Sequence, residues 1–137
     1  MSRMIALLAV IAASLGLAGC SKPPYENVDN ARLKALIEQG VPLIDVRRPD
    51  EWKQTGVVEG SRLLTWVDGG GRVQPGFYEN LATEAPRDKP VVVICRTGNR
   101  TSQLARELME QYGYTRVYNV SDGITGWIAD GQAVSRI

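Results

Sequence analysis

Residues 90–109 decide the fold and read Pro90-Val-Val-Val-Ile-Cys-Arg-Thr-Gly-Asn-Arg-Thr-Ser-Gln-Leu-Ala-Arg-Glu-Leu-Met109. The continuous β-branched run from Val91 to Ile94 is typical of a central parallel strand buried on both faces. After a short polar loop the apolar residues recur at helical spacing, with Leu104, Ala105 and Leu108 on one face. The stretch therefore predicts a strand, a tight loop and a helix. Cys95 falls at the carboxyl edge of the sheet, where open α/β sheets place their chemistry.

The surroundings of Cys95 favour a reactive thiolate. Backbone N–H groups at a helix N-terminus carry a partial positive charge, and Arg96 and Arg100 add two full charges within five residues. These features predict a nucleophile. The alternative is that Cys95 is a small buried hydrophobic residue without reactivity, as many lone cysteines are.

Three segments resemble the rhodanese-like sulfurtransferase family. Residues 95–100 are similar to its active-site loop, Cys-Arg-x-Gly-x-Arg followed by Ser or Thr. Residues 43–47, with Glu51 and Trp52 after them, resemble the family's Asp-Val-Arg strand and turn, and residues 122–127 resemble its closing Gly-Gly…Trp segment. The resemblance covers residues 28–128. Residues 56–61 depart from the pattern, because the histidine that the family commonly shows there is missing.

The resemblance implies an α/β fold of three layers, with a central parallel sheet of about five strands flanked by helices. It also implies a two-step transfer in which Cys95 takes a sulfane sulfur from an anionic donor such as thiosulfate and passes it to cyanide or a thiol. Arg96 and Arg100 would attract the donor, and no metal or organic cofactor is needed. The substrate-binding residues expected from the family's loop and strand motif are Thr97, Gly98, Asn99, Thr101 and Arg47.

Other functions stay open at this stage. Phosphatases with a cysteine loop have five residues between the cysteine and the arginine, whereas four separate Cys95 from Arg100. The shorter loop favours a sulfur atom over a phosphate. The chain could also be a membrane-tethered binding module without catalysis, or a thiol or persulfide relay for a protein partner.

The N-terminus reads as an export signal. Arg3 precedes a short apolar run that ends in Leu17-Ala-Gly-Cys20, which resembles the bacterial lipoprotein processing box. We expect residues 1–19 to be a signal peptide, residues 20–26 to be a lipidated N-terminus and linker, and residues 27–137 to be the rhodanese-like domain. Cys20 would then anchor an exported domain to a bacterial membrane, facing the periplasm. An ordinary secretory signal and a Cys20–Cys95 disulfide are the alternatives.

Composition narrows the chemistry. The net charge is +1 and there is no basic tract, which argues against nucleic-acid binding. The chain has no histidine, so Ser-His-Asp and Cys-His catalysis and histidine-ligated zinc are excluded. We expect a monomer.

The remaining elements follow from periodicity and capping residues. Asp45 lies at the end of a strand, and we expect it to order a loop or to pair with an arginine rather than to catalyse. We expect Arg47 or Arg48 to face the pocket. Trp66 either roofs the pocket or packs in the core. The glycine-rich residues 68–76 form a loop or a partner surface. We expect helices at 29–40, from Pro49, at 77–82 and at 124–129, and further strands at 42–46, 63–67 and 116–120.

Overall fold

Strand β4 (Val91–Ile94) is the central strand of a five-stranded parallel sheet. A computed structural model describes residues 22–137; the predicted signal peptide (1–19) and the lipidation site Cys20 lie outside the described residues. The sheet order is β1-β5-β4-β2-β3, and all four pairings are parallel. The other strands are β1 (Glu26–Val28), β2 (Leu43–Asp45), β3 (Arg62–Leu63) and β5 (Val117–Val120).

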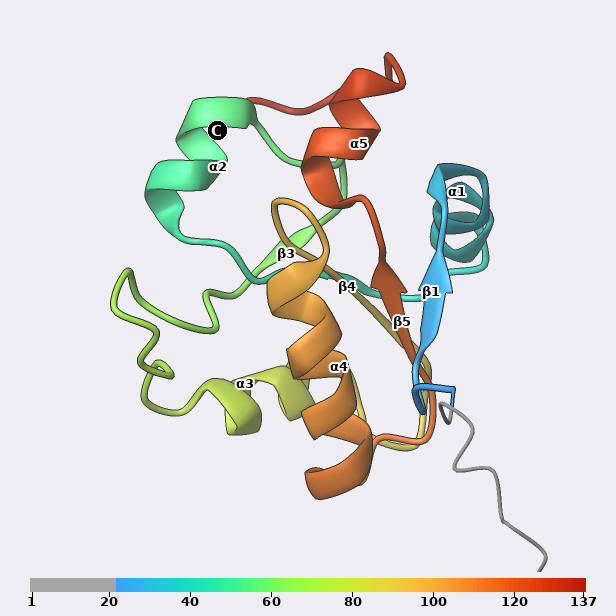
Figure 1. Cartoon of the computed structure of the whole chain (residues 1–137), viewed down its shortest axis with the longest axis vertical. Helices are drawn as coiled ribbons and strands as arrows, with labels where there is room; N and C mark the ends of the chain where they lie inside the picture. The colour runs from blue at the N-terminus through green and yellow to red at the C-terminus, as the bar shows by residue number, and fades with distance from the viewer. Residues whose placement is uncertain (1–21) are drawn as a thin grey trace, which may run out of the picture.

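Helices alternate with the strands along the chain, as Figure 1 shows. They are α1 (Asn30–Glu38), α2 (Pro49–Thr55), α3 (Phe77–Glu84), α4 (Asn99–Gln111) and α5 (Gly123–Ala129). The Asp29 side chain caps α1 by accepting the N–H of Arg32 at 2.8 Å, and Pro49 opens α2, as the sequence predicts. No helix within residues 22–137 is long and apolar enough to span a bilayer.

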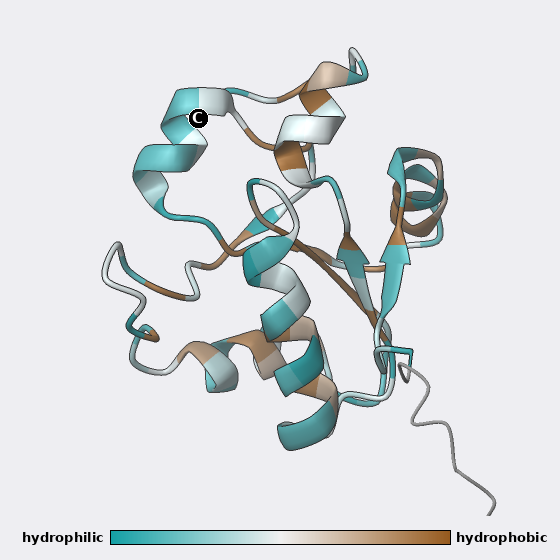
Figure 2. Ribbon diagram, viewed as in Figure 1, coloured by the Kyte–Doolittle hydropathy of each residue, from teal (hydrophilic) through white to brown (hydrophobic). Residues whose placement is uncertain are grey.

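The core has two layers because side chains alternate along each strand. Val91, Val93 and Cys95 point toward α3 and α4, where they pack with Phe77, Leu81, Leu104 and Leu108. Val92 and Ile94 point the other way and pack with residues of α1 and α5 such as Leu36 and Trp127. Figure 2 shows β4 as apolar along its length and the outward side of α4 as hydrophilic. The three-layer α/β arrangement is therefore confirmed.

Two strands differ from the sequence prediction. The strand predicted at 63–67 is only Arg62–Leu63, because its neighbour β2 ends at Asp45. Leu64 and Trp66 still donate to the carbonyls of Asp45 and Val46, and the chain then forms a hairpin closed by the Val67–Val73 bridge. Strand β1 was not predicted as an element: only Val28 of its three residues is buried, so it carries no apolar pattern. It forms because β5 offers a free edge, with Asn27 opposite Asn119.

The register of the sheet brings the site residues together. Asp45 of β2 lies beside Ile94 of β4, so the segments that follow both strands emerge at the same edge. Cys95 is the first residue after β4, and Val46 donates its N–H to the carbonyl of Ile94 at 3.1 Å. The loop at 95–98 and the loop at 46–48 are therefore neighbours.

Candidate active site

The thiol of Cys95 lies between β4 and α4 and is held by two short contacts. The backbone N–H of Gly98 donates to Sγ at 3.2 Å, and Oγ1 of Thr101 lies 3.3 Å from Sγ. Within residues 22–137, Cys95 has no disulfide partner, and it is only 1% exposed. The alternative of a Cys20–Cys95 disulfide involves a residue outside the described range. The sulfur is thus seated inside the loop rather than displayed on the surface.

The backbone of the loop is fixed by the segment at 121–125. Gly98 has a φ of +91°, and a Cβ at this position would collide with the backbone of Ser121. The first residues of α5 bond the loop directly: Ile124 donates its N–H to the carbonyl of Cys95 at 2.9 Å, and Thr125 donates to that of Arg96 at 3.0 Å. The closing segment that resembles the family's Gly-Gly…Trp motif therefore serves to hold the nucleophile loop in shape.

Arg100 is fixed by Glu51 of α2. The two side chains form a bidentate ion pair, with nitrogen–oxygen distances of 2.8 and 2.6 Å. Burial alone would raise the pKa of Glu51, but the hydrogen bonds from Arg100 and from the backbone of Arg48 outweigh it and lower the pKa to about 2. The hydrogen bond to Glu51 in turn raises the pKa of Arg100. Both groups are charged across the physiological range.

The prediction that Arg47 binds substrate is wrong. Its side chain is 0% exposed, and its guanidinium donates to Asp45 at 2.9–3.2 Å, to the Thr55 hydroxyl at 2.9 Å and to the Gly56 carbonyl at 3.0 Å. Asp45 is also fully buried and accepts the indole N–H of Trp52 at 3.0 Å. Asp45 thus has the structural role that the sequence favours, and Arg47 is its counter-ion. The neighbouring Arg48 is the one that faces the pocket.

A cavity of about 520 Å³ opens beside the loop. Three arginines (Arg48, Arg96 and Arg100) line it together with three carboxylates (Glu51, Asp68 and Glu107). Within residues 22–137, Arg96 is the one of these arginines that forms no ion pair. It is exposed, so its charge is available to an anion that enters the cavity.

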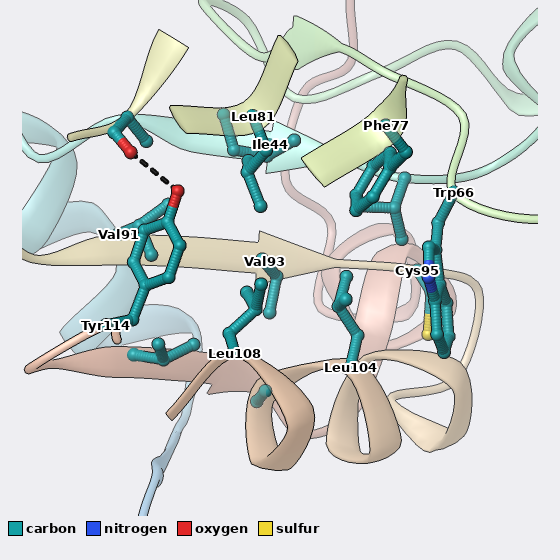
Figure 3. Close-up of a cluster of buried hydrophobic side chains, with 14 residues drawn as sticks. Ile44, Trp66, Phe77, Leu81, Val91, Val93, Cys95, Leu104, Leu108 and Tyr114 are labelled. Carbon is teal, nitrogen blue, oxygen red and sulfur yellow. Dashed lines mark hydrogen bonds between the residues drawn. The ribbon is translucent and has the colours of Figure 1, made fainter. Parts of the chain in front are cut away.

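Trp66 has both of the roles that the sequence allows, since it borders the pocket and also packs in the core. It lines the cavity, yet it is only 4% exposed and belongs to the core cluster that contains Cys95. Figure 3 shows Trp66 and Cys95 together at one end of this cluster. The indole N–H donates to the hydroxyl of Tyr78 at 3.2 Å, and that hydroxyl donates to Glu107 at 3.0 Å. Burial first, and then the bond to Glu107, raise the pKa of Tyr78, which keeps this link protonated.

The remaining loop residues occupy different places. Thr97 and Asn99 are exposed and do not line the cavity, whereas Gly98 and Thr101 are buried against the sulfur. Sequence reasoning assigned no role at the site to two of its partners, Glu51 and Asn119. Glu51 carries a signal, because it is the third residue of the helix that Pro49 opens, and a glutamate at that position is typical of a capping box. Asn119 lies within an apolar strand and has no such signal.

Comparison with known proteins identifies the family. The family model of the rhodanese-like domain matches residues 29–130. The chain belongs to the rhodanese-like family. Within residues 22–137, this rhodanese-like domain holds no group of three or more His, Cys, Asp or Glu side chains that could bind a metal.

Several relatives of this rhodanese-like domain are similar over most of its length. A sulfurtransferase of Allochromatium vinosum is 45% identical over 93 residues, which cover 68% of this chain and 77% of the relative. A thiosulfate sulfurtransferase GlpE of Pseudomonas syringae pv. syringae is 29% identical over 75% of this chain and 87% of the relative. A further curated relative is longer, and the chain spans 64% of it. Among solved structures, the polysulfide-sulfur transferase homodimer of Wolinella succinogenes has a TM-score of 0.65 and 25% identity, covering 83% of this chain and 80% of that one.

Proposed function

We propose that this protein is a sulfurtransferase in which Cys95 carries the transferred sulfur as a persulfide. The observation that carries the proposal is the position of Sγ of Cys95. It accepts the N–H of Gly98 inside a loop that turns at this glycine, and the loop lies beside a cavity lined by arginines. Family membership and sulfurtransferase relatives support transfer of sulfur in general. We extend this to an anionic sulfane donor such as thiosulfate, with a thiol or cyanide as acceptor.

The reaction has two displacement steps. The Cys95 thiolate attacks the outer sulfur of thiosulfate, a new S–S bond forms on Cys95, and the old S–S bond breaks so that sulfite leaves with the electron pair. An acceptor thiolate or cyanide then attacks the outer sulfur of the persulfide. The Cys95 thiolate leaves with its electron pair and is ready for the next donor.

Two arginines and one backbone N–H take part in these steps. Arg96 attracts the donor dianion and offsets the charge of departing sulfite, since no carboxylate within residues 22–137 pairs with it. Arg100 adds a fixed positive charge near Sγ, although Glu51 offsets part of it. The N–H of Gly98 stabilises negative charge on the sulfur in both steps.

The burial of Cys95 supports sulfur transfer over phosphoester hydrolysis. With 1% of the residue exposed, only the narrow end of a donor can reach Sγ. A terminal sulfane sulfur is such an end, whereas a tetrahedral phosphate needs room around all its oxygens. The short loop of four intervening residues acts in the same direction.

The first experiment is the intact mass of the domain 22–137 after incubation with thiosulfate. We expect a gain of about 32 Da, one sulfur atom, which cyanide or a thiol then removes. Cys95→Ser should gain nothing, and Arg96→Ala should gain the same mass at a lower rate. No gain on a protein whose Cys95 is reduced would refute the thiosulfate reaction. If a persulfide on another protein still transfers its sulfur to Cys95, the chain is a relay. If no donor transfers sulfur to Cys95, the chain is a binding module.

We also propose that the domain is exported and lipid-anchored through Cys20, at the periplasmic side of a bacterial membrane, and that it acts as a monomer. The processing box Leu17-Ala-Gly-Cys20 supports the anchor. When the full chain is expressed in a bacterium with labelled palmitate, the label and the protein should both appear in the membrane fraction. Cys20→Ser should lose both. Light scattering on the domain 22–137 tests the monomer.

A further inference from the structure

The hydroxyl of Thr101 lies in a buried polar cluster directly beneath the thiol. Thr101 is 0% exposed, and its Oγ1 lies 3.3 Å from Sγ of Cys95, 2.5 Å from Oδ1 of Asn119 and 3.4 Å from the carbonyl of Gly98. Asn119 is 2% exposed. Its Nδ2 donates to the Gly98 carbonyl at 3.3 Å and to Oδ1 of Asn27 at 3.0 Å. Every polar atom of this cluster has a partner.

Counting protons shows a conflict at Thr101. A threonine hydroxyl has one proton, and two oxygens 2.5 Å apart need a proton between them. Since the amide oxygen of Asn119 can only accept, the hydroxyl proton goes to Asn119. Oγ1 then presents only lone pairs to Sγ. A neutral thiol can donate its S–H to them, but a thiolate meets no donor there.

The same atoms allow a second arrangement. The side-chain amide of Asn119 is nearly symmetric in shape, so a half-turn exchanges Oδ1 and Nδ2 without moving the chain. Nδ2 then donates to Oγ1 of Thr101, and the hydroxyl proton is free to turn to the sulfur. Asn27 is exposed and can turn its own amide to donate to the relocated oxygen. The carbonyl of Gly98 loses the bond from Nδ2 but keeps the N–H of Ser102 at 3.0 Å. In this arrangement the sulfur accepts from Gly98 and from Thr101.

We propose that Asn119 is a positioning residue that sets the direction of the Thr101 hydroxyl and thereby shifts Cys95 between a resting thiol and a reactive thiolate. The inference rests on the proposed function, in which Cys95 is the nucleophile. The Asn119 amide turns when the Cys95 thiol gives its proton to water, and it turns back when the thiolate takes a proton from water. No charge is added, so the cluster stabilises each form without the histidine that the chain lacks.

The test compares the thiolate content of Cys95 in variants of the domain 22–137 at pH 7. The ultraviolet thiolate absorbance, taken as the difference from the matching Cys95→Ser protein, needs no access to the buried sulfur. Alkylation by iodoacetamide gives its reactivity. Asn119→Leu removes the acceptor, so we expect the ratio of thiolate to thiol to rise by about threefold or more. Asn27→Ala removes a partner of the Asn119 amide from both arrangements, so it should change the ratio less than Asn119→Leu does.

The matched control is each substitution in a Thr101→Val background. Without the hydroxyl, Asn119→Leu and Asn27→Ala should no longer change the thiolate content, because Asn119 acts only through Thr101. Equal rises in both backgrounds overturn the inference, and so does an unchanged or lower ratio with Thr101 present. If Asn119→Leu fails to fold, Asn119→Val replaces it, because valine also lacks the acceptor and suits a strand. No sulfur donor is used, so a protein that passes this test but takes up no sulfur refutes the proposed function and leaves this inference standing.

Discussion

Glu51 of α2 and Arg100 of α4, 49 residues apart in sequence, form the ion pair that fixes the end of the Cys95 loop. Nη1 and Nη2 of Arg100 donate to the two carboxylate oxygens at 2.8 and 2.6 Å. Glu51 also accepts the backbone N–H of Arg48 at 3.0 Å, which caps α2. One carboxylate therefore ties the helix after β2 to the helix after β4.

Glu51→Gln should lower kcat/KM for sulfur transfer. The NH2 group of the amide cannot accept a hydrogen bond, so one of the two bonds from Arg100 is lost and its side chain is no longer fixed near Sγ. We expect a loss of roughly tenfold. Asp50→Asn is the matched control, since Asp50 is exposed and, among the described residues, pairs only with Arg48. Thiosulfate-dependent turnover with cyanide measures both. Equal losses in the two variants would contradict a role for Glu51 in holding Arg100.

Stability should depend on pH through Glu51. Its pKa falls from an ordinary 4.5 to about 2 on folding, so its contribution is complete above pH 4.5 and is lost as the pH falls toward 2. We expect the free energy of unfolding to fall by about 2 kcal/mol more in the wild type than in Glu51→Gln over this window. Urea denaturation at pH 5, 4 and 3 measures the difference; parallel curves would show that the pair does not form.

Gly98→Ala should destabilise the domain more than Gly40→Ala. Both glycines have positive φ, +91° and +81°, so the backbone cost of about 1–2 kcal/mol is shared. A Cβ at Gly98 meets the backbone of Ser121, whereas a Cβ at Gly40 meets no atom of residues 22–137 within 4 Å. We expect an additional loss of about 2 kcal/mol for Gly98→Ala in thermal denaturation. Equal losses would mean that the loop can move away from Ser121.

Arg47→Met should strongly destabilise the fold. It leaves Asp45 buried without its counter-ion, at a cost of about 3–5 kcal/mol. Arg62→Met is the control, because Arg62 forms an exposed ion pair with Glu84 and should change stability by less than about 1 kcal/mol. Chemical denaturation compares the two. A small effect of Arg47→Met would indicate that Asp45 is protonated or reaches water.

Periodicity was sufficient for the elements that carry their own apolar pattern. Val91–Ile94 and the face of Leu104 and Leu108 predicted β4 and α4, and Asp29 and Pro49 predicted where α1 and α2 begin. Strand β1 was missed, because its pairing comes from the edge of β5 and not from its own residues. The strand predicted at 63–67 was too long, because local residue preference cannot show where the neighbouring strand β2 ends.

By itself, the sequence determined the chemistry that is local to one stretch: a cysteine after a buried strand, arginines within five residues and a glycine turn before a helix. Only the tertiary structure decided which of the charged side chains are available to a substrate. Arg47 looked like Arg96 in sequence, but burial against Asp45 makes it part of the core, while Arg96 remains exposed at the cavity. The physical reason is that the desolvation and pairing of a charge depend on residues brought from other strands and helices. Asn119 and Glu51, distant along the chain, complete the site for the same reason.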